Sequence, residues 1–170
     1  MRQLLSRMIM AVAPFWAMVD AAPVQAATNI VQVQASVTKP LTLAWIQDLD
    51  LGSITVGPGT WSNATVSISR AGVFSCPNAN VTCSGSTQVA TYNVTGNNND
   101  VVRINVPNVT LVNQSDPTKT LTLVVDSPTS ITLTNSGKPG SNFSIGGSIT
   151  LNSSTAGGTY AGTFNVTINY

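Results

Sequence analysis

The chain has 170 residues, of which 42% are hydrophobic and only 8% are charged, with two Cys and no His. Soluble domains usually carry roughly 25% charged residues. All the acidic residues are Asp, so the usual catalytic base, the usual zinc ligand and most paired Asp/Glu acid–base sites are missing. A formal net charge of +1 without a basic run disfavours nucleic-acid binding. We therefore expect no enzyme and no cofactor.

The N-terminus has the pattern of a signal peptide. Arg2 and Arg7 precede an apolar run over residues 8–18, and Val24-Gln25-Ala26 supplies the small residues that a signal peptidase accepts. The run is too short to span a bilayer, although a retained membrane anchor is the alternative interpretation. We predict that residues 1–26 are removed and that the chain is exported through the periplasm, to be secreted or held at the cell surface.

Residues 27–170 are long enough for one domain with a substantial core. Because export leads to an oxidising compartment, we predict a disulfide between Cys76 and Cys83, the only two cysteines. The residues between them are rich in turn formers, which indicates that the bridge staples the tip of a hairpin.

Apolar and polar residues alternate along most of the chain, which is typical of half-buried β-strands. In the first such segment, residues 29–38, one face is apolar and consists of Val31, Val33, Ala35 and Val37. The last segment places apolar or small residues at every second position, including Tyr160, Phe164, Val166, Ile168 and Tyr170. Further strands are expected near residues 41–45, 49–54, 66–68, 89–95, 102–106, 109–112, 121–125, 131–133, 143–145 and 149–151.

About ten short strands separated by turn signals predict an all-β protein, either a sandwich or a barrel. The half-polar alternation favours an antiparallel β-sandwich of two sheets, each solvated on its outer face, over a closed barrel.

Two groups of oxygen-bearing side chains are candidate cation sites. Asp48 and Asp50 lie on one face of a strand and could chelate Ca²⁺ or serve a glycosidase, or they could simply be solvated. The run over residues 97–100 offers Asn and Asp oxygens, but Asn is also common in tight turns because it tolerates left-handed backbone. We favour the structural interpretation for both groups, and we expect no bound metal.

The two Trp residues beyond the leader are expected to differ. Trp45 continues the apolar parity of its strand, so we predict that it belongs to the core. Trp61 follows a Gly-Pro-Gly turn and is predicted to be exposed, either as a hydrophobic cap or as a platform on which a sugar stacks.

The segment 27–38 begins directly after the predicted cleavage site and is a candidate donor strand. It could fill a sheet edge in its own molecule or in a neighbouring copy. In the second case the main chain would give affinity and the apolar face would give register, and the repeated head-to-tail contact would build a filament.

Motifs at both ends carry a family resemblance. The opening Val33-Gln34-Ala35-Ser36-Val37, the segment Leu49–Ile54 and the ending Ala156–Tyr160 resemble subunits of chaperone–usher pili, including the archaic, spore-coat-like class. The segments Pro40–Gly52 and Gly158–Phe164 are similar to those of secreted bacterial β-sandwich domains of unknown function. Many pilus subunits carry a Cys in the first strand, where this chain is apolar.

The resemblance implies an immunoglobulin-like fold that lacks one strand. It also implies a periplasmic chaperone that reads the C-terminal strand, an usher, and other copies of the chain as partners. The leading hypothesis is an exported, pilin-like structural subunit of a surface fibre that serves adhesion. The alternative is a free-standing secreted or surface-attached binding module, for example for carbohydrate.

Overall fold

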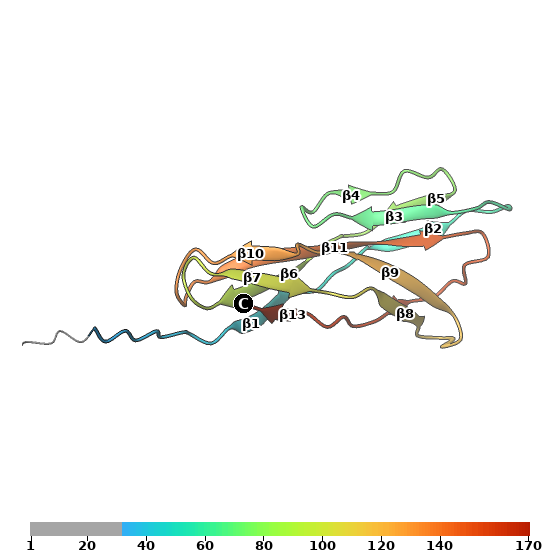
Figure 1. Cartoon of the computed structure of the whole chain (residues 1–170). Helices are drawn as coiled ribbons and strands as arrows, with labels where there is room; N and C mark the ends of the chain where they lie inside the picture. The colour runs from blue at the N-terminus through green and yellow to red at the C-terminus, as the bar shows by residue number, and fades with distance from the viewer. Residues whose placement is uncertain (1–31) are drawn as a thin grey trace, which may run out of the picture. The chain divides into compact units, whose positions relative to one another are not determined.

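The computed structural model of the protein describes residues 32–170 (Figure 1). The predicted signal peptide, residues 1–26, lies outside the described residues. Residues 32–36 belong to a unit separate from the body, Val37–Tyr170, and each is considered by itself. Over residues 32–170 the secondary structure consists of strands without a helix, so nothing there forms an apolar helix of membrane-spanning length. The all-β prediction is confirmed.

All strand pairings of the body are antiparallel. The strands are β1 (Thr42–Gln47), β2 (Ser53–Val56), β3 (Ala64–Ile68), β4 (Phe74–Ser75), β5 (Val81–Ser84), β6 (Ala90–Thr95), β7 (Val101–Asn105), β8 (Val109–Asn113), β9 (Thr120–Asp126), β10 (Ser130–Thr132), β11 (Ser141–Leu151), β12 (Tyr160–Ala161) and β13 (Thr167–Asn169).

The pairings form one long path and two smaller sheets. The path runs β1-β6-β11-β9-β8-β12, with β3 beside β11 and β4 beside β3, while β10-β7-β13 and β2-β5 form the smaller sheets. Strand β9 changes partner midway, because residues 120–123 pair with β8 and residues 124–126 pair with β11. Strand β11 pairs with β6 in its first half and with β3 in its second half. These partner changes allow the path to fold over a core as a sandwich.

The core consists of two apolar clusters. The first packs β3, β5, β8, β9 and β11 together, and the second packs β6 and the first half of β11 against β7. Leu49, Val125 and Phe164 contact both clusters and join them. The alternation of apolar and polar residues therefore directs the apolar faces inward, as predicted. Of the three joining residues, Leu49 lies near the start of the body and Phe164 near its end.

Strand β11 is a single strand of eleven residues, although the sequence predicted two short ones. Its middle crosses β3 so closely that a Cβ on Gly146 would collide with the backbone at Ile68 and Ser69. Glycine permits this approach, since it has no side chain to displace. The strand therefore continues through the crossing instead of ending there.

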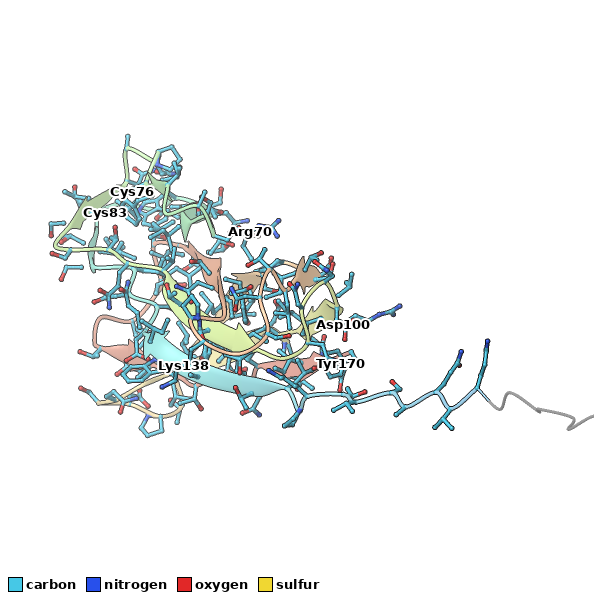
Figure 2. All side chains as sticks on the ribbon, turned by 90° about the vertical axis from the view of Figure 1, so that its left-hand side faces the viewer. Arg70, Cys76, Cys83, Asp100, Lys138 and Tyr170 are labelled. Carbon is cyan, nitrogen blue, oxygen red and sulfur yellow. A yellow bond between two sulfur atoms is a disulfide. The ribbon has the colours of Figure 1, made fainter. Side chains whose placement is uncertain are left out.

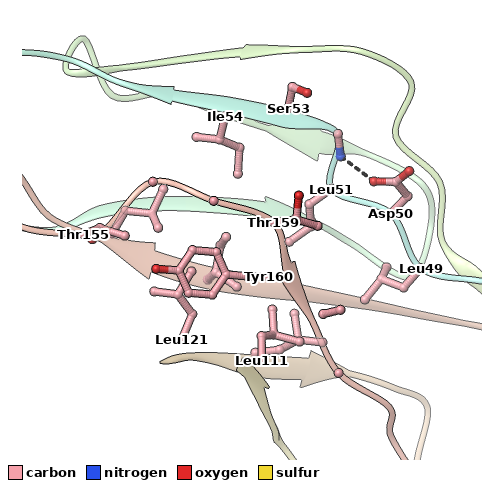
Figure 3. Close-up of a pocket in the computed structure, with 18 of the residues that line it drawn as sticks. Leu49, Asp50, Leu51, Ser53, Ile54, Leu111, Leu121, Thr155, Thr159 and Tyr160 are labelled. Atoms are coloured by element: carbon pink, nitrogen blue, oxygen red, sulfur yellow. Dashed lines mark hydrogen bonds between the residues drawn. The ribbon is translucent and has the colours of Figure 1, made fainter. Parts of the chain in front are cut away.

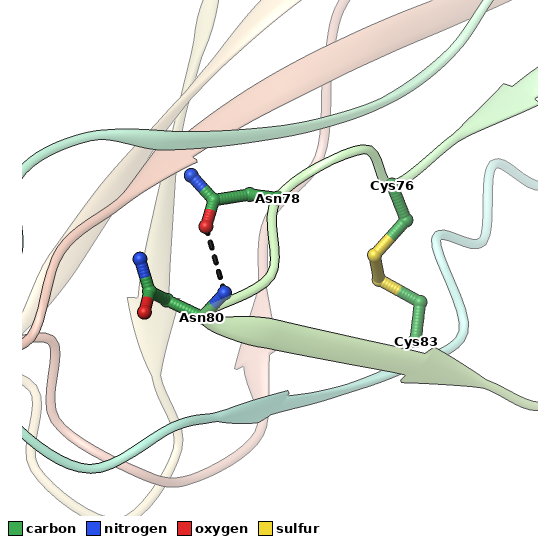
Figure 4. The surroundings of a disulfide bond; sticks show 4 residues. All are labelled: Cys76, Asn78, Asn80 and Cys83. Atoms are coloured by element: carbon green, nitrogen blue, oxygen red, sulfur yellow. Dashed lines mark hydrogen bonds between the residues drawn. A yellow bond between two sulfur atoms is a disulfide. The ribbon is translucent and has the colours of Figure 1, made fainter.

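The predicted disulfide between Cys76 and Cys83 is present, but its structural setting differs from the expectation (Figure 4). Cys76 follows β4, which pairs with β3, and Cys83 lies in β5, which pairs with β2. The bridge therefore does not staple a hairpin; it joins strands of two different sheets. Between the cysteines, the Asn80 N–H donates to Asn78 Oδ1 at 2.8 Å and closes a turn.

The prediction that Trp45 is buried is wrong. Its side chain is 61% exposed, although the alternation of the strand correctly predicts that it lies on the inner face of the sheet. Trp45 lies opposite Tyr92 of β6, and Tyr92 lies opposite the buried Phe143 of β11, so all three side chains are on the inner face. Trp45 is exposed because β1 is the edge strand of its sheet.

The predicted continuous C-terminal strand is broken in two. β12 pairs with β8 and β13 pairs with β7, and residues 162–166 between them belong to no strand. The register of β12 against β8 differs by one residue from the register of β13 against β7. The connection between β7 and β8 carries Pro107, which has no N–H to donate. The alternation nevertheless persists, since Phe164, Val166 and Ile168 are half-buried against the core.

The first predicted strand, residues 29–38, is not a strand over the part that the structure describes. Residues 32–40 have no strand pairing, and their side chains are exposed. Val33 and Val37 of the predicted apolar face are 88% and 87% exposed, and Val31 lies outside the described residues. Alternation by itself does not make a strand, because a strand also requires an edge with which to pair.

Candidate functional site

A groove of about 850 Å³ lies between the first and last segments of the body (Figure 3). One wall is the segment Asp48–Val56, which includes β2, and the other is the segment Thr155–Phe164, which includes β12. The base consists of leucine and isoleucine side chains from β8, β9 and β11, namely Leu111, Leu121, Leu123, Ile149 and Leu151. The groove thus opens directly onto the first core cluster.

The β2 wall presents unpaired main-chain groups. β2 pairs with β5 on one side only, and the Gly57 N–H continues that ladder by donating to the Asn80 carbonyl at 2.7 Å. Alternate residues of an antiparallel strand point their N–H and C=O groups to opposite sides. In this register Ile54 and Val56 direct these groups away from β5 and toward the groove.

The opposite wall has the same property. The Gln114 N–H donates to the Thr159 carbonyl at 2.8 Å, which places Thr159 in a hydrogen-bonded position of the β8–β12 ladder. The next residue, Tyr160, therefore directs its N–H and C=O toward the groove. Its hydroxyl donates to the Ala156 carbonyl at 2.8 Å and braces the loop 155–158.

A buried asparagine holds this second wall in place. Asn113 is 1% exposed, and its Nδ2 donates to the Gly157 carbonyl at 3.0 Å. Its Oδ1 accepts the backbone N–H groups of Ser115 and Asp116 at 2.9 and 3.2 Å. Gly158 lies so close, with a φ of 139°, that an added Cβ would be 2.5 Å from Asn113 Nδ2. The loop 155–158 is thereby fixed to the end of β8.

The groove is almost uncharged. Asp48 and Asp50, at its rim, are the charged residues of the lining. The Asp50 Oδ1 accepts the Gly52 N–H at 2.8 Å, and the Asp48 Oδ1 accepts the Trp45 indole N–H at 3.0 Å. Burial raises the pKa of Tyr92 in the lining, and the Asp48 carboxylate raises it further. Such a surface suits main-chain and apolar contacts better than a charged ligand.

The remaining candidate residues make contacts within the body. Trp61, which was predicted to be exposed, is half-buried against the first core cluster, and its Nε1 donates to the Gly57 carbonyl at 3.2 Å. Asn97 Nδ2 donates to Asp100 Oδ2 at 3.0 Å within the turn that was considered as a cation site. Across residues 32–170 no group of three or more His, Cys, Asp or Glu side chains gathers as metal ligands would.

The last residue of the chain closes the other end of the body (Figure 2). The Tyr170 hydroxyl donates to the Lys39 carbonyl at 2.7 Å and accepts the Asn97 N–H at 3.1 Å. The Lys39 N–H in turn donates to Asn97 Oδ1 at 2.9 Å. Residues 39, 97 and 170 thus form a clamp, which fixes the start of the body against its C-terminus.

Two residues that shape the site, Asn113 and Tyr92, were not among the predicted site residues. Asn113 lies in a polar stretch before the Asp116-Pro117 turn, and an Asn two residues before a turn is a known signal for a side chain that caps backbone N–H groups. No comparable signal marks Tyr92, whose position depends on the pairing of β6 with both β1 and β11.

Comparison with protein families finds one matching family model, described as a domain of unknown function (DUF4402), over residues 41–170. Comparisons with curated proteins and with solved structures find no significant match. The matched residues include every strand of the body and both walls of the groove. The chain therefore belongs to the DUF4402 family of β-proteins.

Proposed function

We propose that this protein is an exported structural subunit of a surface fibre, assembled by β-strand complementation and serving adhesion. In this proposal, residues 27–38 of one copy fill the groove between β2 and β12 of the next copy. The groove is the observation that carries the proposal, since both of its walls are strands that lack a neighbour on the groove side.

An added strand would meet hydrogen-bonding groups on both sides. Ile54 and Val56 on one wall and Tyr160 on the other direct N–H and C=O groups into the groove, and buried main-chain groups are strongly favoured to be paired. The base offers leucine and isoleucine side chains to one face of that strand. An extended chain with an apolar face and a polar face satisfies both requirements.

The N-terminal segment has this character. Its apolar face consists of Val31, Val33, Ala35 and Val37, and its polar side chains lie between them. Residues 31–37, which carry the apolar face, span roughly 20–23 Å in extended form, and the nine residues of the wall Asp48–Val56 span roughly 30 Å at the same rise per residue. The apolar part of the donor segment is therefore short enough to lie within the groove.

The partners follow from this geometry and from the resemblance to chaperone–usher subunits. Because the donor segment and the groove are different surfaces, each contact leaves one donor and one groove free, and repetition gives an open filament. A vacant groove would expose apolar surface before assembly, so a periplasmic chaperone that covers it and an usher that exchanges it are the expected accessory proteins.

The test compares two double variants of the mature chain, residues 27–170. Val33→Arg with Val37→Arg places charges on the donor face, and Gln34→Arg with Ser36→Arg places the same charges on the opposite face. We expect the first variant to remain monomeric and the second to form fibres like the wild type, as measured by size-exclusion chromatography and electron microscopy. The monomeric variant should also bind a synthetic peptide of residues 27–38.

The proposal is refuted if the two variants assemble equally well. It also fails if the wild-type chain stays monomeric and the monomer takes up no peptide. A folded monomer with its groove closed by its own residues 27–38 would instead indicate a free-standing exported domain.

A further inference from the structure

A row of three aromatic side chains crosses the inner face of the sheet next to the groove. Phe143 and Tyr92 stack, with ring centroids 5.7 Å apart and an interplanar angle of 19°. Trp45 is the next residue in the row, directly opposite Tyr92. Exposure rises along the row, from 5% at Phe143 to 61% at Trp45. The inner face of the sheet therefore ends in a large aromatic side chain that the body does not cover.

The strands around Trp45 explain why its side chain is exposed. The second core cluster lies between β1, β6 and β11 on one side and β7 and β13 on the other. On the second side β13 is an edge strand, and the Trp45 ring opposite stays 61% exposed. Trp45 also adjoins the groove, because its indole N–H donates to Asp48 and it pairs with Tyr92, both of which line the groove.

The C-terminal segment lines the groove at residues 162–164, together with Tyr92, which pairs with Trp45, and Asp48, which accepts its indole N–H. Residues 162–166 of that segment belong to no strand and hold Phe164 against both core clusters. A donor that continues past β12 along residues 162–166 therefore approaches the uncovered end of the aromatic row. The Asp48 carboxylate already holds the indole N–H, so covering the ring leaves no buried donor unpaired.

We propose that Trp45 is the anchoring residue of the interface between copies, the side chain that the donor strand of a second copy covers. This inference rests on the proposed function and adds a named binding residue outside the apolar base of the groove. Large aromatic residues that become buried on binding are enriched among the few residues that contribute most of the binding energy. The intramolecular hydrogen bond to Asp48 fixes the ring in advance, which lowers the entropic cost of binding.

The experiment uses the monomeric donor-face variant of the mature chain and a labelled peptide of residues 27–38. The peptide contains no Trp, so changes in Trp fluorescence report on the acceptor alone. In a Trp61→Phe background Trp45 is the single Trp, and in the matched Trp45→Phe background Trp61 is. On saturation with peptide we expect Trp45 emission to move to shorter wavelength and its quenching by acrylamide to fall, with little change for Trp61.

Substitution gives an independent readout. Trp45→Ala should weaken peptide binding by roughly thirtyfold or more, the loss that defines a hot spot, while Trp45→Phe retains most of the affinity. Because Trp45 is exposed in the monomer, neither change should lower the midpoint of thermal unfolding appreciably. The peptide's fluorescence anisotropy measures binding separately from Trp emission.

The outcomes separate this inference from the proposed function. If the peptide binds but Trp45 emission and the affinity of Trp45→Ala are unchanged, the strand fills the groove without covering Trp45, and the anchoring role is refuted while complementation stands. If the peptide does not bind and the wild-type chain forms no fibre, the proposed function itself fails.

Discussion

Replacing Asn113 with Ala should detach one wall of the groove from the body. The side chain is 1% exposed and makes three hydrogen bonds, to the Gly157 carbonyl and to the N–H groups of Ser115 and Asp116. Each such bond contributes about 1 kcal/mol net, so the expected loss in the free energy of unfolding is about 3 kcal/mol. One of the three bonds holds loop 155–158, so we also expect weaker binding of the donor peptide.

Urea denaturation of the monomeric variant measures this loss, as a lower midpoint at unchanged slope. Asn152→Ala is the matched control, because Asn152 Oδ1 accepts the Ser154 N–H at 2.9 Å in a similar turn but is exposed to solvent. Water replaces those contacts, and the control should lose about 0.5 kcal/mol or less. Asn113→Asp should lie between the two, since it keeps both accepted bonds but places an oxygen against the Gly157 carbonyl.

Equal losses at Asn113 and Asn152 would contradict the view that burial gives Asn113 its importance. Gly158→Ala offers a second check, because its Cβ would occupy the space of the Asn113 amide. The two substitutions should be non-additive, with the double variant losing clearly less than the sum of the single losses. Additive losses would show that Asn113 and Gly158 act independently.

Three further results are expected. Reducing the disulfide, or changing Cys76 and Cys83 to Ser, should lower the free energy of unfolding by about 2.5 kcal/mol, the loop-closure entropy of an eight-residue loop; an unchanged urea midpoint would contradict this. Gly146→Ala should cost about 3 kcal/mol because the β3 backbone cannot move aside, whereas Gly157→Ala, with open space around it, should cost little; similar costs would refute the close approach. The raised pKa of Tyr92 gives stability that is complete below about pH 10 and declines as the pH rises further, and Tyr92→Phe should reduce that alkaline decline; equal alkaline declines would refute it.

Alternation along the sequence was sufficient to predict an all-β fold and the inward faces of most strands. Val94 and Val102 are buried because each continues a period-two pattern in a strand with a partner on both sides. The pattern also gives the correct direction for Trp45. It cannot show that β1 is an edge strand, because that depends on how distant segments pair, and so the exposure of Trp45 was missed.

Partner changes were equally invisible in the sequence. The division of the C-terminal strand between β8 and β7 results from a one-residue slip opposite Pro107, and the change of partner within β9 depends on where β11 lies. The donor role of residues 27–38 stays a prediction. The groove could not be predicted from the sequence, since its two walls, residues 48–56 and 155–164, are separated by about a hundred residues along the chain.

The clamp between the first and last residues of the body has a mechanical consequence. A pulling force on the N-terminal segment enters the body at Lys39, where the carbonyl is held by Tyr170 and the N–H by Asn97. The load is thus divided among β1, the end of β13 and the turn after β6 before it can peel β1 from its sheet. Replacing Tyr170 with Phe would remove the hydroxyl and leave more of the tension on β1.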